Sequence, residues 1–189
     1  MYIDPTGLED EIVTPTYFNQ NQWTKTEGFS EKFYETACAA TATLNAVSFQ
    51  YTIETGEALS FEEGKNMMFA AIEIDAVDIE DATVNDWQNA ANSMGIYIGL
   101  NGEFVVNEIS PTLKIYAFTN PSEGFSVPVH FSFVTNQVTQ VFIDSWDGIE
   151  KGWSVDGFCG GIPNIPYRTC PLQTGRPYRG FDYIQKKAE

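Results

Sequence analysis

The sequence predicts one α+β domain, with its helices in the first half of the chain and antiparallel strands in the second. Residues up to about 95 carry the spacing of apolar residues and the capping residues that are typical of helices. After residue 95 the apolar residues come in short runs separated by turn residues, which indicates strands. Because helices and strands are segregated, we expect an α+β fold and not an alternating parallel sheet.

Three helices are expected, over about residues 31–50, 60–74 and 84–94. The first is rich in alanine and carries Cys38 in its first half. Its start is left open between Ser30 and Ala37. Thr36 is a possible N-cap, because a threonine hydroxyl two residues before Cys38 could accept a backbone hydrogen bond from the first turn.

Polar capping residues bound the second and third helices. Ser60 and Glu63 form a capping box, in which each side chain bonds the backbone N–H of the other residue. For the third helix we expect Thr83 as the N-cap, Asp86 at the third helical position and Gly95 directly after the last residue.

Five strands are expected after the helices, over residues 96–100, 103–108, 113–118, 129–135 and 139–144. The last two flank Asn136 and Gln137, a pair that suits a tight turn, so they form a predicted hairpin. From Gly148 onward the chain is rich in glycine and proline, and we expect loops there.

Composition narrows the range of partners. The chain has 189 residues, 43% of them hydrophobic, which is enough for one domain with its own core. Its 26 acidic and 10 basic residues give a net charge of −16. Nucleic acids and anionic membranes attract basic proteins, so neither is expected as a partner, whereas a basic protein is. There is no run of 18 apolar residues, so no membrane span is expected.

No cofactor and no metal are expected. The acidic stretch from Glu73 to Asp81 lacks the ligand positions and the glycine of an EF-hand. Gly157, Gly160 and Gly161 do not follow the strand–loop–helix pattern of a phosphate site.

The cysteines leave two redox states open. Cys159 and Cys170 lie close enough in sequence to form a disulfide, and two free thiols are the alternative. Together with Cys38 and the single histidine, they do not have the spacing of zinc ligands.

The residues with the clearest chemical pattern are Cys38, His130 and Asp144. A thiol attacks as its thiolate, and a helix N-terminus lowers the thiol pKa. His130, the only histidine, lies on a predicted strand, where it could take the thiol proton and later protonate the leaving group. Asp144 ends the next strand and could orient the imidazole, with Asp147 as the alternative.

A fourth residue could stabilise the negative charge of a tetrahedral intermediate. Such an oxyanion needs hydrogen-bond donors, and the side-chain amide of Gln20 together with the backbone N–H of Cys38 could supply them. Gln22 is the alternative amide.

The order of these four residues resembles that of the papain-like cysteine peptidases. The matching segments are YFNQ with Trp23, TACAAT, VHFSFV and IDSWDG, and they are most similar to the bacterial branch related to the double-glycine leader peptidases. The resemblance covers about residues 16–148. Ala37 is a departure, because many members have glycine before the cysteine.

This resemblance implies both a fold and a set of roles. N-terminal helices carrying the cysteine would pack on a C-terminal antiparallel sheet carrying the histidine and the aspartate. Gln20 would be the oxyanion amide, Cys38 the nucleophile, His130 the base and Asp144 the residue that orients it.

A second resemblance lies at residues 2–8, YIDPTGL, which are similar to the motif that closes the core of RHS/YD-repeat toxins. It implies that residues 1–15 are the tail of a repeat core and that residues 16–189 are a papain-like catalytic domain. Such a domain would be secreted or delivered to a target cell as part of a larger bacterial protein. A cognate immunity protein would then be a partner. The start of the chain also lacks the basic and apolar regions of a signal peptide.

We therefore expect a cysteine-dependent hydrolase that acts on peptide or side-chain amide bonds of a protein or peptide substrate. It would be a protease or a deamidase, and with an amine in place of water the same groups would catalyse transglutamination. The alternative is a non-catalytic binding domain on a papain-like fold that captures a partner protein. That alternative predicts ordinary reactivity for Cys38.

Overall fold

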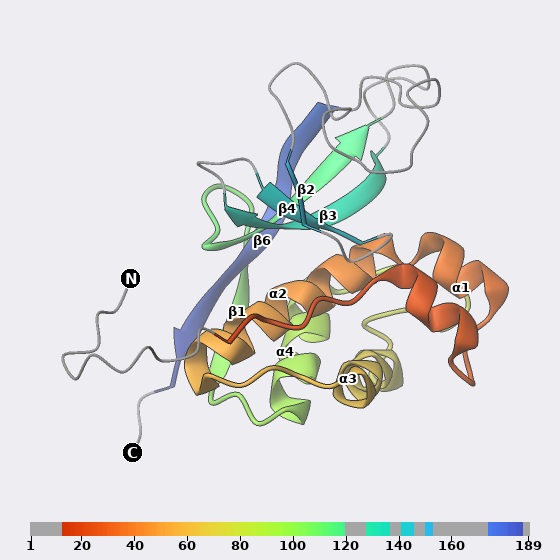
Figure 1. The fold of residues 1–189 in the computed structure, drawn as a ribbon, viewed down its shortest axis with the longest axis horizontal. Helices are drawn as coiled ribbons and strands as arrows, with labels where there is room; N and C mark the ends of the chain where they lie inside the picture. Colours follow the sequence, from red (N-terminus) through yellow and green to blue (C-terminus); the bar gives the residue numbers. More distant parts are fainter. Residues whose placement is uncertain (1–12, 120–127, 137–140, 146–149, 153–173, 187–189) are drawn as a thin grey trace.

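The computed structural model describes residues 13–119, 128–136, 141–145, 150–152 and 174–186. Its helices lie on one side of an antiparallel sheet (Figure 1), which confirms the predicted α+β class. The helices are η1 Gln20–Lys25, α1 Glu31–Thr36, α2 Cys38–Thr55, α3 Phe61–Glu73 and α4 Trp87–Tyr97. The strands are β1 Gly102–Asn107, β2 Leu113–Thr119, β3 Pro128–Asn136, β4 Val141–Asp144, β5 Glu150–Gly152 and β6 Thr174–Gln185.

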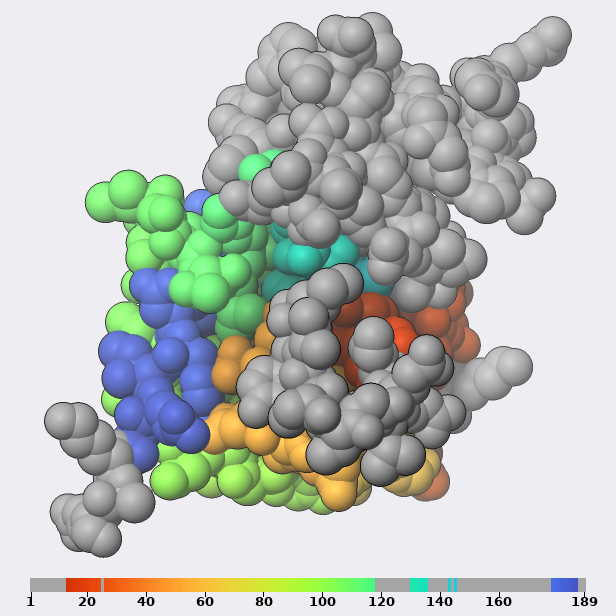
Figure 2. All heavy atoms as spheres, turned by 60° about the vertical axis from the view of Figure 1, so that its left-hand side comes forward, coloured from red at the N-terminus to blue at the C-terminus, as the bar shows by residue number. Residues whose placement is uncertain are grey.

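The sheet brings together strands that are far apart in the sequence. Its order is β1-β6-β2-β3-β4-β5, and every neighbouring pair is antiparallel. α2 packs on β3, and α4 packs on both α2 and β1. In the space-filling view, the blue surface of β6 lies against the green surface of neighbouring segments, with the orange surface around α2 beside it (Figure 2). Because α2 packs on β3, the helix that begins with Cys38 lies against the strand that carries His130.

The first predicted helix, over residues 31–50, is interrupted at Ala37. This residue has φ −71° and ψ 9°, and it ends α1 and precedes α2. Thr36 is not the N-cap of α2, because it is the last residue of α1 and Ala37 holds the N-cap position. The Thr36 hydroxyl lies within hydrogen-bond distance of the carbonyls of Lys32 and Asp81 instead. α2 therefore begins at Cys38 without a side-chain cap.

The predicted capping box at the second helix is confirmed. The Glu63 N–H donates to Ser60 Oγ at 3.2 Å, and the Ser60 N–H donates to Glu63 Oε2 at 2.7 Å. α3 accordingly begins at Phe61, within one residue of the predicted start.

The predicted start of the third helix is wrong. The N-cap of α4 is Asp86, not Thr83, and its carboxylate accepts a hydrogen bond from the Asn89 N–H at 3.0 Å. The residues before it belong to a loop, because Val84 pairs with Val77 in an isolated antiparallel bridge. That pairing takes up the backbone which a helix starting at residue 84 would have used.

The predicted end of the third helix and the strand at 96–100 are also wrong. α4 continues through Gly95 to Tyr97. A Cβ on Gly95 would lie 2.9 Å from the ring of Phe104, so the glycine permits close packing of β1 instead of ending the helix. Of the apolar run after Gly95, Ile96 and Tyr97 are thus the last residues of the helix, and Ile98 is its C-cap.

The other predicted strands are confirmed as β1, β2, β3 and β4, and β3 and β4 pair as the predicted hairpin. β5 and β6 lie where the sequence predicts loops. β6 lies between β1 and β2 although it contains Gly175, Pro177 and Gly180. The register of β2 against β6 shifts between Ile115 and Tyr116, directly opposite this proline-containing stretch, and such an irregularity tolerates the missing proline N–H.

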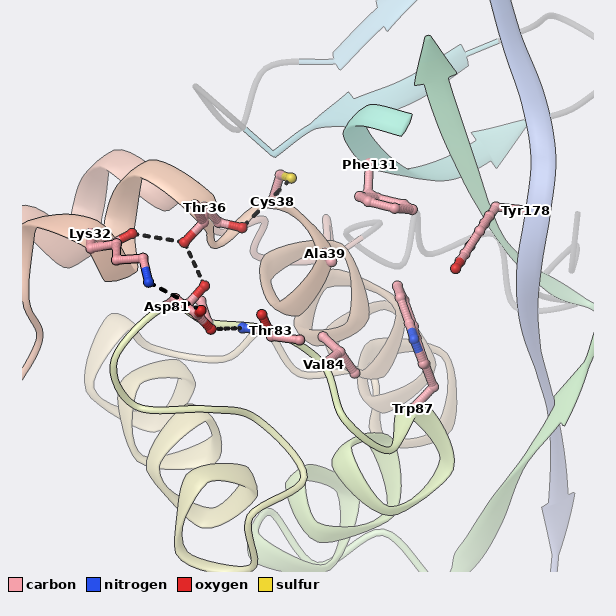
Figure 3. Close-up of a pocket in the computed structure, with 11 residues that line it drawn as sticks. Lys32, Thr36, Cys38, Ala39, Asp81, Thr83, Val84, Trp87, Phe131 and Tyr178 are labelled. Carbon is pink, nitrogen blue, oxygen red and sulfur yellow. Dashed lines mark hydrogen bonds and ion pairs between the residues drawn. The ribbon is translucent and has the colours of Figure 1, made fainter. Parts of the chain in front are cut away.

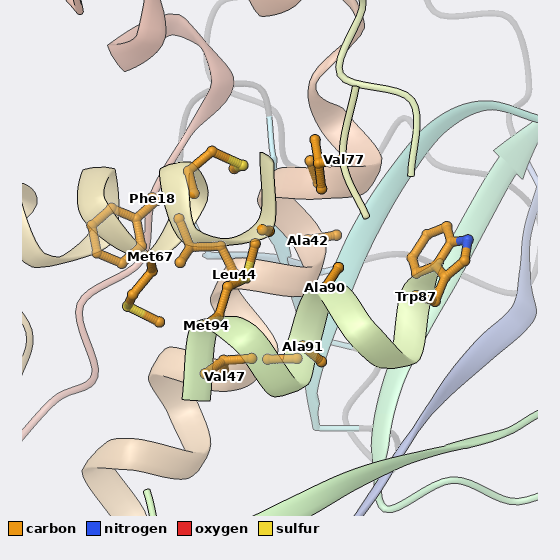
Figure 4. Close-up of a cluster of buried hydrophobic side chains, with 14 of the residues drawn as sticks. Phe18, Ala42, Leu44, Val47, Met67, Val77, Trp87, Ala90, Ala91 and Met94 are labelled. Carbon is orange, nitrogen blue, oxygen red and sulfur yellow. The ribbon is translucent and has the colours of Figure 1, made fainter. Parts of the chain in front are cut away.

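The hydrophobic core is centred on α2. Its alanines at positions 40, 42 and 46 are fully buried. Their small side chains let Met67 of α3 and Met94 of α4 approach α2 around Leu44 (Figure 4). This packing fixes α2 along its length, and with it the position of Cys38 at its first residue.

Several predictions concern residues that lie outside the described ranges. They are the repeat-like segment at residues 2–8, the turn residue Gln137, the alternative aspartate Asp147 and the state of Cys159 and Cys170. Within the described part of the chain, no helix has both the length and the apolar character needed to cross a membrane.

Candidate active site

Cys38 lies where the chain leaves one helix and starts the next. It is the first residue of the 18-residue helix α2, and its side chain is half-buried. The thiol also contacts the carbonyl oxygen of Thr36, with an Sγ–O distance of 3.8 Å. Because the positive end of the helix dipole faces this thiol, the position favours the thiolate form.

Cys38 and His130 are brought together from α2 and β3. Burial raises the pKa of the Cys38 thiol. The hydrogen bond and the charge of His130 lower it, and so do the backbone N–H groups of Phe131 and Ala39. These effects outweigh burial, and the pKa of Cys38 lies below its ordinary value. The predicted pairing of the cysteine with the only histidine is thus present in the folded chain.

Asp144 lies on the strand next to His130. It ends β4, as predicted, and its register partner is Ser132 of β3. His130 is two residues before Ser132, so Asp144 and His130 occupy diagonal positions on neighbouring strands. Two residues in such diagonal positions are usually about 7–8 Å apart. The role of Asp144 as the residue that orients the imidazole stays a prediction.

Gln20 is buried, and its amide is already engaged. Its Nε2 donates to the carbonyl oxygens of Tyr34 at 3.0 Å and of Glu35 at 3.3 Å. Its backbone N–H donates to the Ser145 carbonyl at 2.7 Å, next to Asp144. Gln22, the alternative amide, uses its Oε1 to accept from the Asn19 N–H at 2.9 Å in the capping box of η1.

The partners of Gln20 explain why the helix breaks before the cysteine. In a continuous α-helix the carbonyls of Tyr34 and Glu35 would accept the N–H groups of Cys38 and Ala39. α1 ends at Thr36, and Ala37, with ψ 9°, does not continue it, so α2 starts again at Cys38. The Gln20 amide therefore takes the place of these two donors, and the Ala39 N–H is free to stabilise the thiolate.

A Gln20→Leu substitution is expected to raise the pKa of Cys38. Without the amide, Tyr34 and Glu35 can recover the N–H groups of α2, and the thiolate loses a charge-assisted hydrogen bond worth about 1.5–3 kcal/mol. Alkylation of Cys38 by iodoacetamide near pH 6 should slow about tenfold, because one pKa unit changes the thiolate fraction tenfold. An unchanged alkylation profile with slower turnover would instead assign Gln20 to the oxyanion.

A pocket of about 300 Å³ opens beside Cys38 (Figure 3). Its apolar wall is formed by Ala39, Val84, Trp87, Phe131 and Tyr178. Its opposite end is polar and contains Lys32, Thr36, Asp81 and Thr83. The wall combines residues from α2, α4, β3, β6 and the loop before α4, so only the folded chain assembles it.

The sequence alone does not reveal this pocket. Phe131 could have been found, because it follows His130 directly. Trp87 and Tyr178 could not, since one belongs to a helix whose start was misplaced and the other to the strand predicted as loop. Comparisons of the chain with protein-family models, curated proteins and solved structures found no match.

Proposed function

We propose that this protein is a cysteine-dependent hydrolase of peptide or side-chain amide bonds. The observation that carries the proposal is the pairing of Cys38 with His130 at the start of α2, with the thiol pKa below its ordinary value. A structural cysteine buried in an apolar core would have a raised pKa instead. The order of residues shared with papain-like cysteine peptidases supports the same chemistry.

The proposed reaction has two steps. The Cys38 thiolate attacks the carbonyl carbon, a C–S bond forms, and the C–N bond breaks as the His130 imidazolium gives its proton to the leaving amine. Water then attacks the thioester. His130 takes one proton from this water, the acid product leaves, and the thiolate is restored.

Asp144 has the proposed role of orienting His130. The backbone N–H groups near the start of α2 have the proposed role of binding the oxyanion. The proposed setting is an effector domain of a larger secreted bacterial protein, paired with an immunity protein. Residues 2–8 alone support that setting.

The rate of Cys38 alkylation as a function of pH tests this proposal. The wild-type Cys38 should react with iodoacetamide well below the pH at which ordinary thiols do, because its thiolate persists to lower pH. In the His130→Ala variant burial would remain while the hydrogen bond and the charge are lost. The pKa should therefore rise, and the rate near pH 6 should fall at least about tenfold.

Mass spectrometry assigns the alkylated residue, so Cys159 and Cys170 serve as internal controls in each sample. A wild-type Cys38 with an ordinary thiol profile, unchanged in His130→Ala, would remove the basis for the hydrolase. It would favour the binding domain instead.

A further inference from the structure

A second hollow of the molecule is a groove between α3 and α4. These two helices pack against each other and lie side by side below α2 (Figure 1). Of the described residues, none lines both this groove and the pocket beside Cys38. We propose that the groove is the docking site of a basic partner protein, which inserts an aliphatic or aromatic side chain between the two helices. The binding of such a partner does not depend on the activity of Cys38.

The groove exposes large apolar side chains to solvent. Ile96 is 72% exposed, Ile74 52% and Tyr97 49%, and all three line the groove. Its volume of about 410 Å³ lies within the range of about 300–1,000 Å³ that is usual for ligand pockets. A single exposed isoleucine carries no information, but several large apolar side chains gathered in one hollow mark a binding surface.

The polar side chains of the groove already have partners within the chain. The Asn92 Oδ1 accepts the Phe104 N–H at 2.8 Å, and its Nδ2 donates to the Phe104 carbonyl at 2.9 Å. The Nδ2 of Asn89 donates to an Asp86 carboxylate oxygen at 2.9 Å, and the Ser93 hydroxyl donates to a carbonyl of its own helix. Because these hydrogen bonds are already made, the floor of the groove offers a ligand mainly apolar contact.

Carboxylates lie around this apolar floor. Glu73 and Asp75 precede and follow Ile74 directly, and Asp86 is the N-cap of α4. All three acidic residues are exposed. They belong to a longer acidic stretch, because residues 66–113 contain eight acidic residues and no lysine or arginine. The apolar groove is therefore set in a surface of one sign of charge.

This charge decides between the possible occupants. A second copy of the chain would bring the same carboxylates against one another, and like charges across an interface cost several kcal/mol. Anionic membranes and nucleic acids would be repelled as well. A basic protein surface is attracted, and an apolar side chain at its centre would supply much of the binding energy once it is buried in the groove.

The binding of three synthetic peptides tests this proposal. The first has two leucines with three lysines on each side, the second has glycines in place of the leucines, and the third has glutamates in place of the lysines. Each carries fluorescein, and fluorescence anisotropy gives its Kd for the Cys38→Ala chain, which lacks the thiol that could cleave it. We expect the lysine–leucine peptide to bind at least about tenfold more tightly than either of the others.

Two pairs of substitutions locate the apolar contact. Ile74→Ser with Ile96→Ser removes two exposed side chains of the groove and leaves the charge unchanged. It should raise the Kd of the lysine–leucine peptide to near that of the lysine–glycine peptide. Ile53→Ser with Ile109→Ser makes the same change at exposed isoleucines outside the groove, and it should keep the original Kd.

Salt and charge substitutions locate the electrostatic contact. Between about 10 mM and 1 M salt the Debye length falls from about 30 to 3 Å, so the Kd of the lysine–leucine peptide should rise steeply. Glu73→Gln with Asp75→Asn should weaken binding at low salt and flatten this dependence. Glu31→Gln with Glu35→Gln, the matched change on α1, should have a smaller effect on both.

Three results would overturn the proposal. One is an equal Kd for the three peptides, and another is an unchanged Kd of the lysine–leucine peptide in Ile74→Ser with Ile96→Ser. The third comes from sedimentation equilibrium of the chain alone. A dimer that dissociates in Ile96→Ser would assign the groove to a second copy of the chain instead of a basic partner.

Discussion

Replacing His130 with alanine is expected to slow Cys38-dependent ester hydrolysis by about 10²–10⁴-fold, the usual contribution of a positioned general acid–base group. His130 is the only histidine in the chain, and it interacts directly with the thiol. Without His130 the thiol would lose its proton less readily. The leaving group would also lack a proton donor. The measurement is the steady-state release of p-nitrophenolate from an N-acetyl dipeptide p-nitrophenyl ester.

Two controls make this result specific. Cys38→Ala should abolish the reaction, and the double variant should be no slower than Cys38→Ala, because residues that act as a unit are not additive. Added imidazole should restore part of the rate of His130→Ala and none of the rate of Cys38→Ala. A His130→Ala rate within a few-fold of the wild type would assign the histidine to structure.

Replacing Asn45 with leucine is expected to lower the free energy of unfolding by about 2–5 kcal/mol. The Asn45 side chain is fully buried in α2, and it makes both hydrogen bonds to the backbone of Phe18. Its Oδ1 accepts the Phe18 N–H at 2.7 Å, and its Nδ2 donates to the Phe18 carbonyl at 3.0 Å. Leucine keeps the volume but leaves a buried donor and a buried acceptor unpaired, each at a cost of about 1–3 kcal/mol.

Urea unfolding followed by tryptophan fluorescence measures this change. Ser48→Ala is the matched comparison, because the buried Ser48 hydroxyl makes one hydrogen bond to the same segment, to the Thr16 carbonyl at 2.6 Å. Its effect should be about half as large. A loss below about 1 kcal/mol in Asn45→Leu would mean that the Phe18 backbone groups find other partners.

The sequence predicted the elements that depend on local chemistry. The capping box at Ser60 follows from two side chains three residues apart, and it is present. The pairing of Cys38 with His130 was also predictable, since a single histidine leaves only one base for one helix-borne thiol.

The parts that were not predicted depend on distant contacts. β6 contains proline and two glycines, which usually mark loops, yet it lies between β1 and β2. Gly180 is required there by close approach, because a Cβ would lie 2.0 Å from the Leu113 carbonyl oxygen. Likewise, the role of Gln20 depends on which carbonyls lie within its reach, and no spacing in the sequence reveals that.

The amide of Gln20 makes the reactivity of the thiol conditional on how the start of the chain is docked. This amide reaches α1 from a separate segment, which Asn45 and Ser48 hold on α2. A chain cut before Thr26 would keep Cys38, His130 and Asp144, yet α1 and α2 could close into one helix. An N-terminal boundary chosen to trim this segment would also remove the fully buried Phe18 and Trp23, so it would weaken the core as well as silence the thiol. An inhibitor that displaces the Gln20 amide from α1 would silence the thiol without entering the pocket.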